Sequence, residues 1–199
     1  MHSITRRRCR RRNDPLILPS GLCERLIALG GGLLGARWVP EENMHLTLRF
    51  IGEVPESSFD DIAVALSGIN VPAFDLTVMG VGHFERAHRP SMLWAGVESN
   101  AYLTQLHDRI ESALRRIGLK TENRKFHPHI TLARLDETVS PERVAGFLRV
   151  NSLFRAAPFR VEQFILFSSV LGRSGPSYHA EVQFPLVGAV GLSDNDLRR

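Results

Sequence analysis

The chain has 199 residues, 43% of them hydrophobic and 23% charged, which is enough for one globular domain with a sizeable core. No apolar run approaches the roughly 20 residues of a membrane-spanning helix, and no apolar stretch follows the basic start as it does in a secretory signal. We therefore expect no membrane association. The two cysteines, Cys9 and Cys23, predict no disulfide framework and a cytoplasmic location.

The net charge of +4 comes from the start of the chain. Six of the 25 basic residues are arginines in the first twelve positions. Without these six, the chain has 19 basic and 21 acidic residues, a net charge of −2. The body of the chain therefore does not predict a broad nucleic-acid-binding surface. Blocks of like charge are commonly disordered, and we expect residues 1–15 to form a disordered basic leader. The alternative is a non-specific RNA-binding arm. The six arginines are Arg6, Arg7, Arg8, Arg10, Arg11 and Arg12.

The first predicted elements are short. Prolines flank the apolar run 16–18 and leave little room for a strand with a full hydrogen-bond ladder, so this strand is expected to be short or absent. Ser20 is expected to cap a helix over 21–34, although the glycines at 30–32 weaken its end. A strand over 44–50 follows.

Further along, apolar residues recur at helical spacing in three segments and alternate, as in half-buried strands, in others. The predicted helices begin near Ser57 or Ser58, at Asn100 and at Ser140, and the predicted strands cover 74–79, 92–97, the region after Phe126, 159–171 and 178–186.

One tetrapeptide pattern occurs twice, at 45–48 (HLTL) and at 129–132 (HITL). On a strand, residues i and i+2 point to the same face, so each copy presents one imidazole and one hydroxyl on one side and two aliphatic side chains on the other. Imidazole exchanges a proton near neutral pH, and a hydroxyl donates a hydrogen bond to an oxyanion. Two such strands facing each other would suit the opening of a phosphodiester without a metal.

The surroundings of the motif also repeat. Each half of the chain reads as helix, His-Thr strand, helix, strand, turn, strand, with offsets of 84 residues between the histidines and 85 between Phe74 and Phe159. This repeat predicts an α+β fold of two lobes related by a pseudo-twofold axis, each an antiparallel sheet with helices outside. The active-site groove is expected between the lobes. We expect one bilobal domain over 16–187 and a C-terminal tail over 188–199.

The two motifs resemble the signature of the 2H phosphoesterases. Residues 45–50 (HLTLRF) and 126–134 (FHPHITLAR) carry this resemblance, and the nearest branch is the RNA 2′,3′-cyclic phosphodiesterases, also called 2′-5′ RNA ligases. Residues 93–97 (LWAGV) also look like that branch. Members of the family usually open directly on a first strand, whereas this chain has the arginine block.

The resemblance implies metal-independent hydrolysis of an RNA or nucleoside 2′,3′-cyclic phosphate to a 2′-phosphomonoester, without a cofactor and with possible reversible 2′-5′ ligation. By the same resemblance, His45 is the proton donor to the leaving 3′ oxygen and His129 the proton acceptor from water. Thr47 and Thr131 bind the non-bridging phosphate oxygens, and Arg134 lies near the phosphate.

Other residues near the motifs are candidates for substrate binding. Arg49 lies two residues past the first threonine, so alternation places it on the same face, whereas Arg134 lies three past the second threonine and needs a twist to turn inward. His127 shares a face with the second catalytic histidine if the strand extends through it. Phe126 could stack on a base, and Trp94 is expected mainly in the core.

Several alternatives stay open at this point. His45, His127 and His129 offer three nitrogens for a metal site, although this leaves both threonines without a role. The chain could also be a non-catalytic RNA- or nucleotide-binding module of the same fold, or a diesterase acting on another cyclic phosphate or on a 2′-5′ linkage. The expected partner is RNA or a nucleotide that ends in a 2′,3′-cyclic phosphate, and the expected state is a monomer.

Overall fold

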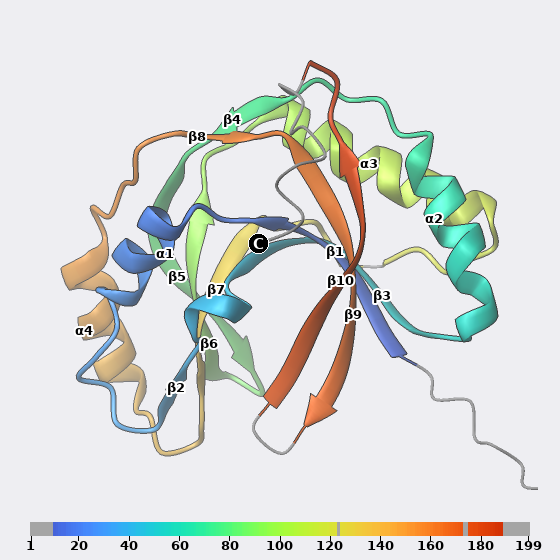
Figure 1. Cartoon of the computed structure of the whole chain (residues 1–199). Coiled ribbons are helices and arrows are strands. Elements are labelled where there is room, and N and C mark those ends of the chain that lie inside the picture. Colours follow the sequence, from blue (N-terminus) through green and yellow to red (C-terminus); the bar gives the residue numbers. More distant parts are fainter. Residues whose placement is uncertain (1–9, 123, 173–174, 189–199) are drawn as a thin grey trace, which may run out of the picture.

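The fold combines helices with antiparallel strands, as predicted (Figure 1). The structure is a computed structural model that describes residues 10–122, 124–172 and 175–188. Its strands are β1 (Arg10–Ile17), β2 (Ala36–Trp38), β3 (His45–Val54), β4 (Phe74–Leu76), β5 (Val78–Arg86), β6 (Arg89–Val97), β7 (His129–Leu135), β8 (Phe159–Val161), β9 (Gln163–Gly172) and β10 (Gly175–Pro185). Its helices are α1 (Ser20–Ile27), α2 (Phe59–Ser67), α3 (Ala101–Arg116) and α4 (Pro141–Asn151), with short 3₁₀ helices η1 (Glu41–Asn43) and η2 (Glu56–Ser58).

The main sheet has the strand order β10-β9-β1-β3-β7-β6-β5, and β2 pairs with β7 beside this path. We call β10-β9-β1-β3 the first lobe and β7-β6-β5 with β2 the second lobe. The two lobes meet where the motif strands β3 and β7 pair, and the register there joins Leu46 to Ile130. The predicted juxtaposition of the two His-Thr strands is therefore present.

The lobes are not the two halves of the sequence, because each half contributes its final hairpin to the other lobe. The hairpin β5-β6 follows the first motif in sequence but pairs with β7, and the hairpin β9-β10 follows the second motif but pairs with β1. The connecting strands β4 and β8 pair with each other in a separate two-stranded sheet. The sequence repeat identified the units correctly, but it did not predict this exchange.

The pseudo-twofold relation is visible in the strand register. Leu46 and Ile130 occupy equivalent places in the two motifs, and they pair with each other. Asp75 and Arg160 follow the equivalent residues Phe74 and Phe159, and they also pair with each other, with an Arg160 Nη1 to Asp75 Oδ1 distance of 3.6 Å. A residue that pairs with its own repeat equivalent lies beside the symmetry axis, so the axis passes close to the motif strands.

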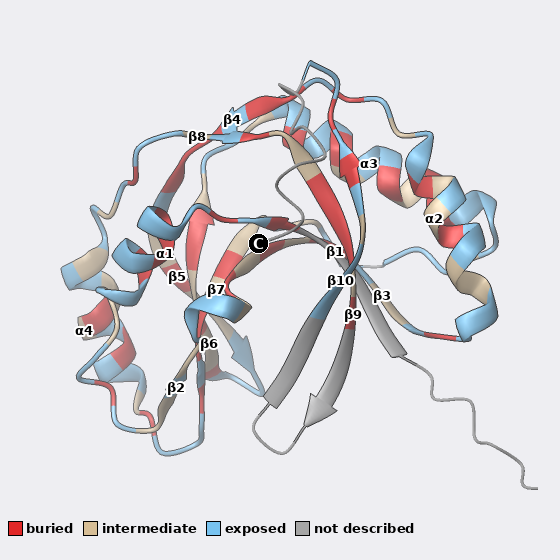
Figure 2. Ribbon diagram, in the orientation of Figure 1, coloured by how far each residue is buried: buried red, intermediate tan, exposed pale blue. Residues whose placement is uncertain are grey.

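The helices cover the outer side of the sheet. Helices α2 and α3 pack beside the first lobe, and α1 and α4 lie beside the second (Figure 1). Figure 2 shows buried residues along the strands and on one side of α2 and α3, with exposed residues on the other side of these helices. Leu46 and Ile130 are fully buried, so the aliphatic residues of both motifs belong to this core.

The first strand is longer than the sequence predicted. Strand β1 covers Arg10–Ile17 and pairs with β3 on one side and β9 on the other, so the expected boundary at residue 16 falls inside a central strand. Its register shifts between Arg12 and Asn13 and again between Asp14 and Pro15. These register shifts let β1 stay paired with β3 on both sides of Pro15, which has no backbone N–H to donate. The rest of the predicted leader, residues 1–9 with Cys9, and most of the predicted tail, residues 189–199, lie outside the described residues.

Other element boundaries follow local chemistry. Helix α1 ends at Ile27, before the glycines, and its N-cap is Pro19, without a side-chain cap bond, rather than the predicted Ser20. The caps at Asn100 and Ser140 form as predicted, with the Asn100 side chain accepting from the Leu103 N–H at 3.0 Å. The predicted strands over 74–79 and 159–171 are each divided in two, as β4 and β5 and as β8 and β9.

Replacement of Leu16 by alanine tests whether β1 is an integral part of the core. Leu16 is 1% exposed, and its neighbour Ile17, on the opposite face, is 53% exposed. We expect Leu16→Ala to lower the free energy of unfolding by roughly 2–5 kcal/mol, because a buried leucine leaves a cavity, and Ile17→Ala to lower it much less. Chemical denaturation measures both, and equal small losses would show that β1 is not integral to the core.

Candidate active site

The two His-x-Thr motifs form a quartet of side chains on one face of the sheet. The pairing of Leu46 with Ile130 is antiparallel, so its register places His45 opposite Thr131 and Thr47 opposite His129. Leu46 and Ile130 point into the core, and the four polar side chains point the other way and are half-buried. Opposed residues of an antiparallel pair lie about 4.5–5.5 Å apart at Cβ, and diagonal ones within roughly 8 Å. The quartet is therefore compact enough to surround one phosphate group.

Both histidines are held in the same way by the backbone. Nδ1 of His45 lies 2.9 Å from the carbonyl oxygen of Asn43, and Nδ1 of His129 lies 2.7 Å from that of His127. In each case the carbonyl belongs to the residue two positions earlier. A carbonyl only accepts, so Nδ1 carries the hydrogen, and Nε2 is the nitrogen at which each neutral ring accepts a proton.

Burial lowers the pKa of both imidazoles. For His45, the Asn43 carbonyl opposes this effect and the charge of His129 adds to it. For His129, the His127 carbonyl opposes the effect of burial and the charge of His127 adds to it. The positive charge of a protonated His129 disfavours protonation of His45, which favours a state with one proton acceptor and one proton donor.

Each motif strand has a register shift directly after the threonine. On β3, Pro15 pairs with Thr47 and Asp14 with Arg49, which leaves Leu48 without a partner in that ladder. On β7, Leu132 is skipped in the same manner in its pairing with β6. Such an irregularity moves the following side chains to the opposite faces, so simple alternation fails beyond this point.

This shift explains where Arg134 lies. The burial pattern of β7 shows Ala133 buried and Arg134 exposed, so the arginine lies on the open side, as His129 and Thr131 do. The inward turn that the sequence required for Arg134 is provided by the register shift at Leu132. Its predicted contact with phosphate stays a prediction.

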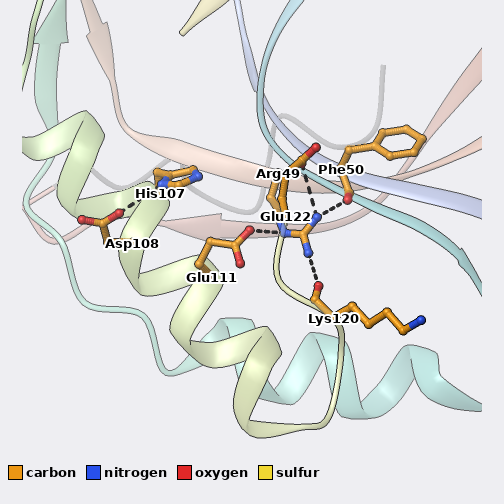
Figure 3. A network of polar contacts seen from close by, with 7 residues as sticks. All are labelled: Arg49, Phe50, His107, Asp108, Glu111, Lys120 and Glu122. Carbon is orange, nitrogen blue, oxygen red and sulfur yellow. Dashed lines mark hydrogen bonds and ion pairs between the residues drawn. The ribbon is translucent and has the colours of Figure 1, made fainter. Parts of the chain in front are cut away.

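Arg49 does not lie on the face of the quartet, as alternation predicted, because the register shift at Leu48 of β3 turns it to the other face. The side chain is only 5% exposed and lies away from the quartet, in a network with helix α3 and the segment that follows it (Figure 3). Its Nε contacts Glu111, its Nη1 lies 3.4 Å from Glu122, and its guanidinium donates to the carbonyls of Phe50 and Lys120. Arg49 thus links β3 to the segment leading into the second motif.

An aromatic cluster surrounds His129. The ring of Phe84 stands edge-on to His129 at 4.9 Å between centroids and to His127 at 5.5 Å, and His127 also lies 4.9 Å from Trp94. His127 thus contributes its carbonyl and its ring to the site. Trp94 is half-buried on the sheet surface rather than enclosed in the core. Phe84 was not identified from the sequence, because the segment around it was predicted as a turn.

Phe126 packs against helix α3. Its ring is stacked on His107 of α3, with 4.0 Å between centroids and 13° between planes.

No group of three His, Cys, Asp or Glu side chains in the described part of the chain is arranged to hold a metal ion. No helix within residues 10–188, gaps excepted, is long and apolar enough to cross a membrane.

Comparison with known proteins adds to this geometry. Residues 25–173 match the model of the 2′-5′ RNA ligase superfamily. The RNA 2′,3′-cyclic phosphodiesterase of Thermotoga maritima is 37% identical over 169 residues, covering 83% of this chain and 87% of the relative. The protein of the same name from Aeropyrum pernix is 36% identical over 141 residues, covering 70% and 80%.

Solved structures show the same fold. The crystal structure of E. coli LigT complexed with 3′-AMP has a TM-score of 0.74 at 27% identity, covering 90% of this chain and 99% of that one. The crystal structure of TT0787 of Thermus thermophilus has a TM-score of 0.73 at 24% identity, covering 88% and 97%.

The Arg49 network predicts a specific stability effect. Arg49→Met should lower the free energy of unfolding by roughly 3–5 kcal/mol, because it leaves the largely buried carboxylate of Glu111 without its counter-charge. The double variant Arg49→Met/Glu111→Leu should recover part of this loss, since removal of both charges leaves neither unpaired. A double variant that is no more stable than Arg49→Met would contradict the pairing.

Proposed function

The chain belongs to the 2′-5′ RNA ligase superfamily, and we propose that it is an RNA 2′,3′-cyclic phosphodiesterase that opens the cyclic phosphate to a 2′-phosphomonoester. Relatives of this name match most of the chain, and LigT, which shares the fold, binds 3′-AMP in its crystal structure. The observation that carries the proposal is the quartet, which places two imidazoles and two hydroxyls on one face around the pseudo-twofold axis.

In the proposed reaction, the four side chains act on one phosphorus atom. Nε2 of His129 accepts a proton from water as the water oxygen bonds to phosphorus, and Nε2 of His45 donates a proton to the 3′ oxygen as its bond to phosphorus breaks. Thr47 and Thr131 donate hydrogen bonds to the non-bridging oxygens, where charge accumulates in the transition state. These groups supply the proton transfers and the charge stabilisation, so the mechanism requires no metal ion.

Arg134 adds a positive charge on the open side, near the developing negative charge. An arginine can bind two phosphate oxygens at once, which favours the same oxyanion as the threonines. If the 5′-hydroxyl of a second RNA replaces water, the same step forms a 2′-5′ linkage. Reversible ligation thus needs no further catalytic group.

Loss of either histidine tests the proposed roles. We expect His45→Ala and His129→Ala each to lower turnover of a 2′,3′-cyclic nucleotide by about 10²- to 10⁴-fold, because each removes one proton transfer. The exposed His179, replaced by alanine, serves as a control with unchanged rate.

The product should be the 2′-phosphomonoester, and the rate should persist in the presence of a chelator. Chromatography of the products distinguishes the 2′- from the 3′-phosphate. Full activity of His129→Ala would end its proposed role, and absence of turnover by the wild-type protein would favour a non-catalytic binding module.

The lowered pKa of both imidazoles predicts the pH dependence. Activity requires one neutral and one protonated ring, so kcat/KM should be bell-shaped and reach its maximum below pH 6.5, the ordinary histidine pKa. A bound phosphate favours the imidazolium form, so the optimum of kcat should lie at higher pH than that of kcat/KM. A kcat/KM optimum above pH 7.5 would contradict the lowered pKa values.

A further inference from the structure

A cleft of about 700 Å³ opens beside the quartet, on the side of His127. Trp94 and His127 line it, together with Phe126 and residues of the first half of helix α3. Its volume lies within the roughly 300–1,000 Å³ of pockets that hold drug-sized ligands, a class that includes one nucleotide.

The Trp94 part of the cleft is a flat aromatic surface. The indole lies across Gly82 of β5, and a Cβ atom at Gly82 would overlap the ring. A Cβ at Gly96 would lie 3.3 Å from the ring, closer than ordinary van der Waals contact. Two glycines on adjacent strands therefore let the indole lie flat on the sheet, which is the orientation that suits stacking of a base.

At helix α3, the lining of the cleft combines an aromatic stack with a cation. Phe126 and His107 are stacked, and Lys125 lies next to them at the exposed end. The carboxylate of Asp108 also lines the cleft, but its Oδ1 lies 3.1 Å from Nδ1 of His107 and is thereby partnered. Aromatic rings beside a lysine match the base and the phosphate of single-stranded RNA.

A second, smaller cleft, of about 260 Å³, has His45 in its lining. Glu41 and Glu42 line it together with apolar side chains, and none of the described residues that line it is a Lys or Arg. These carboxylates would repel an RNA backbone, so the charges of the two clefts favour the passage of RNA past His127.

We propose that the cleft beyond His127 binds the penultimate nucleotide of the RNA, which lies on the 5′ side of the nucleotide that carries the cyclic phosphate. This inference rests on the proposed function. The cyclic phosphate ends the RNA at its 3′ side, so the chain continues only in the 5′ direction. The lining includes His127 but neither His129 nor Thr131, and Lys125 supplies a cation separate from the quartet. The cleft is thus suited to a second nucleotide rather than to the reacting phosphate.

Two substrates distinguish this subsite from the catalytic centre: adenosine 2′,3′-cyclic phosphate and the dinucleotide ApA with a terminal 2′,3′-cyclic phosphate. The measured quantity is the ratio of kcat/KM for the dinucleotide to that for the mononucleotide. We expect a wild-type ratio of roughly 5 to 100, since stacking of one base on an aromatic side chain has effects of this order.

The variants His107→Ala and Lys125→Gln should each lower this ratio at least threefold, because they remove part of the stack and the cation of the cleft. Arg109→Gln is the matched control: Arg109 is exposed on the same helix but does not line the cleft, so the ratio should stay within twofold of wild type. Circular dichroism verifies that each variant is folded.

A wild-type ratio near one, with good turnover of the mononucleotide, would overturn this inference and leave the proposed function intact. An equal fall of the ratio in Arg109→Gln would also overturn it, because the effect would then be general electrostatics rather than a subsite. Absence of turnover of both substrates would overturn the proposed function and this inference together.

Discussion

The pairing of Leu46 with Ile130 is the constraint on which the site depends. It joins the two lobes and sets the register of the motif strands, and both side chains are fully buried in the core. A slip of one residue in this register would exchange the faces of one strand and move its histidine and threonine into the core. The apolar residues of each motif thus determine where the polar ones lie, and the hydrophobic core and the quartet are two sides of the same pair of strands.

The quartet is nearly symmetric, but its surroundings are not. The carbonyl that accepts from Nδ1 belongs to Asn43 in one motif and to His127 in the other, and only the latter residue has a ring that can carry a charge. The exposed position three residues after the threonine is Phe50 in one strand and Arg134 in the other. The charge that lowers the pKa of each ring also differs in source: for His129 it is that of His127, and for His45 it is that of His129. A duplicated fold can therefore give two equivalent histidines different neighbours while it holds both rings in the same way.

The sequence was sufficient to predict the motif strands and their polar faces, because period-two alternation is a local signal, and the repeated pattern predicted that the two motif strands lie together. It failed where the register or support of a neighbouring strand decides the outcome. Pro15 argued against a first strand, but β3 and β9 hold β1 in place on both sides. Arg49 was placed on the wrong face because a register shift at Leu48 depends on the partner strand. Phe84 lies in a segment predicted as a turn, and its contacts with Trp94 of β6 and His129 of β7 form only when β5 joins the sheet.

The most direct test of the shared phosphate site is a titration of the ¹⁵N-labelled protein with inorganic phosphate, followed by long-range ¹H–¹⁵N spectra of the imidazole rings. In the neutral state, His45 and His129 should both carry hydrogen on Nδ1, and the Nε2 signals of both should shift together with one common Kd. A response of only one ring, or two different Kd values, would contradict the account that both imidazoles meet a single phosphate.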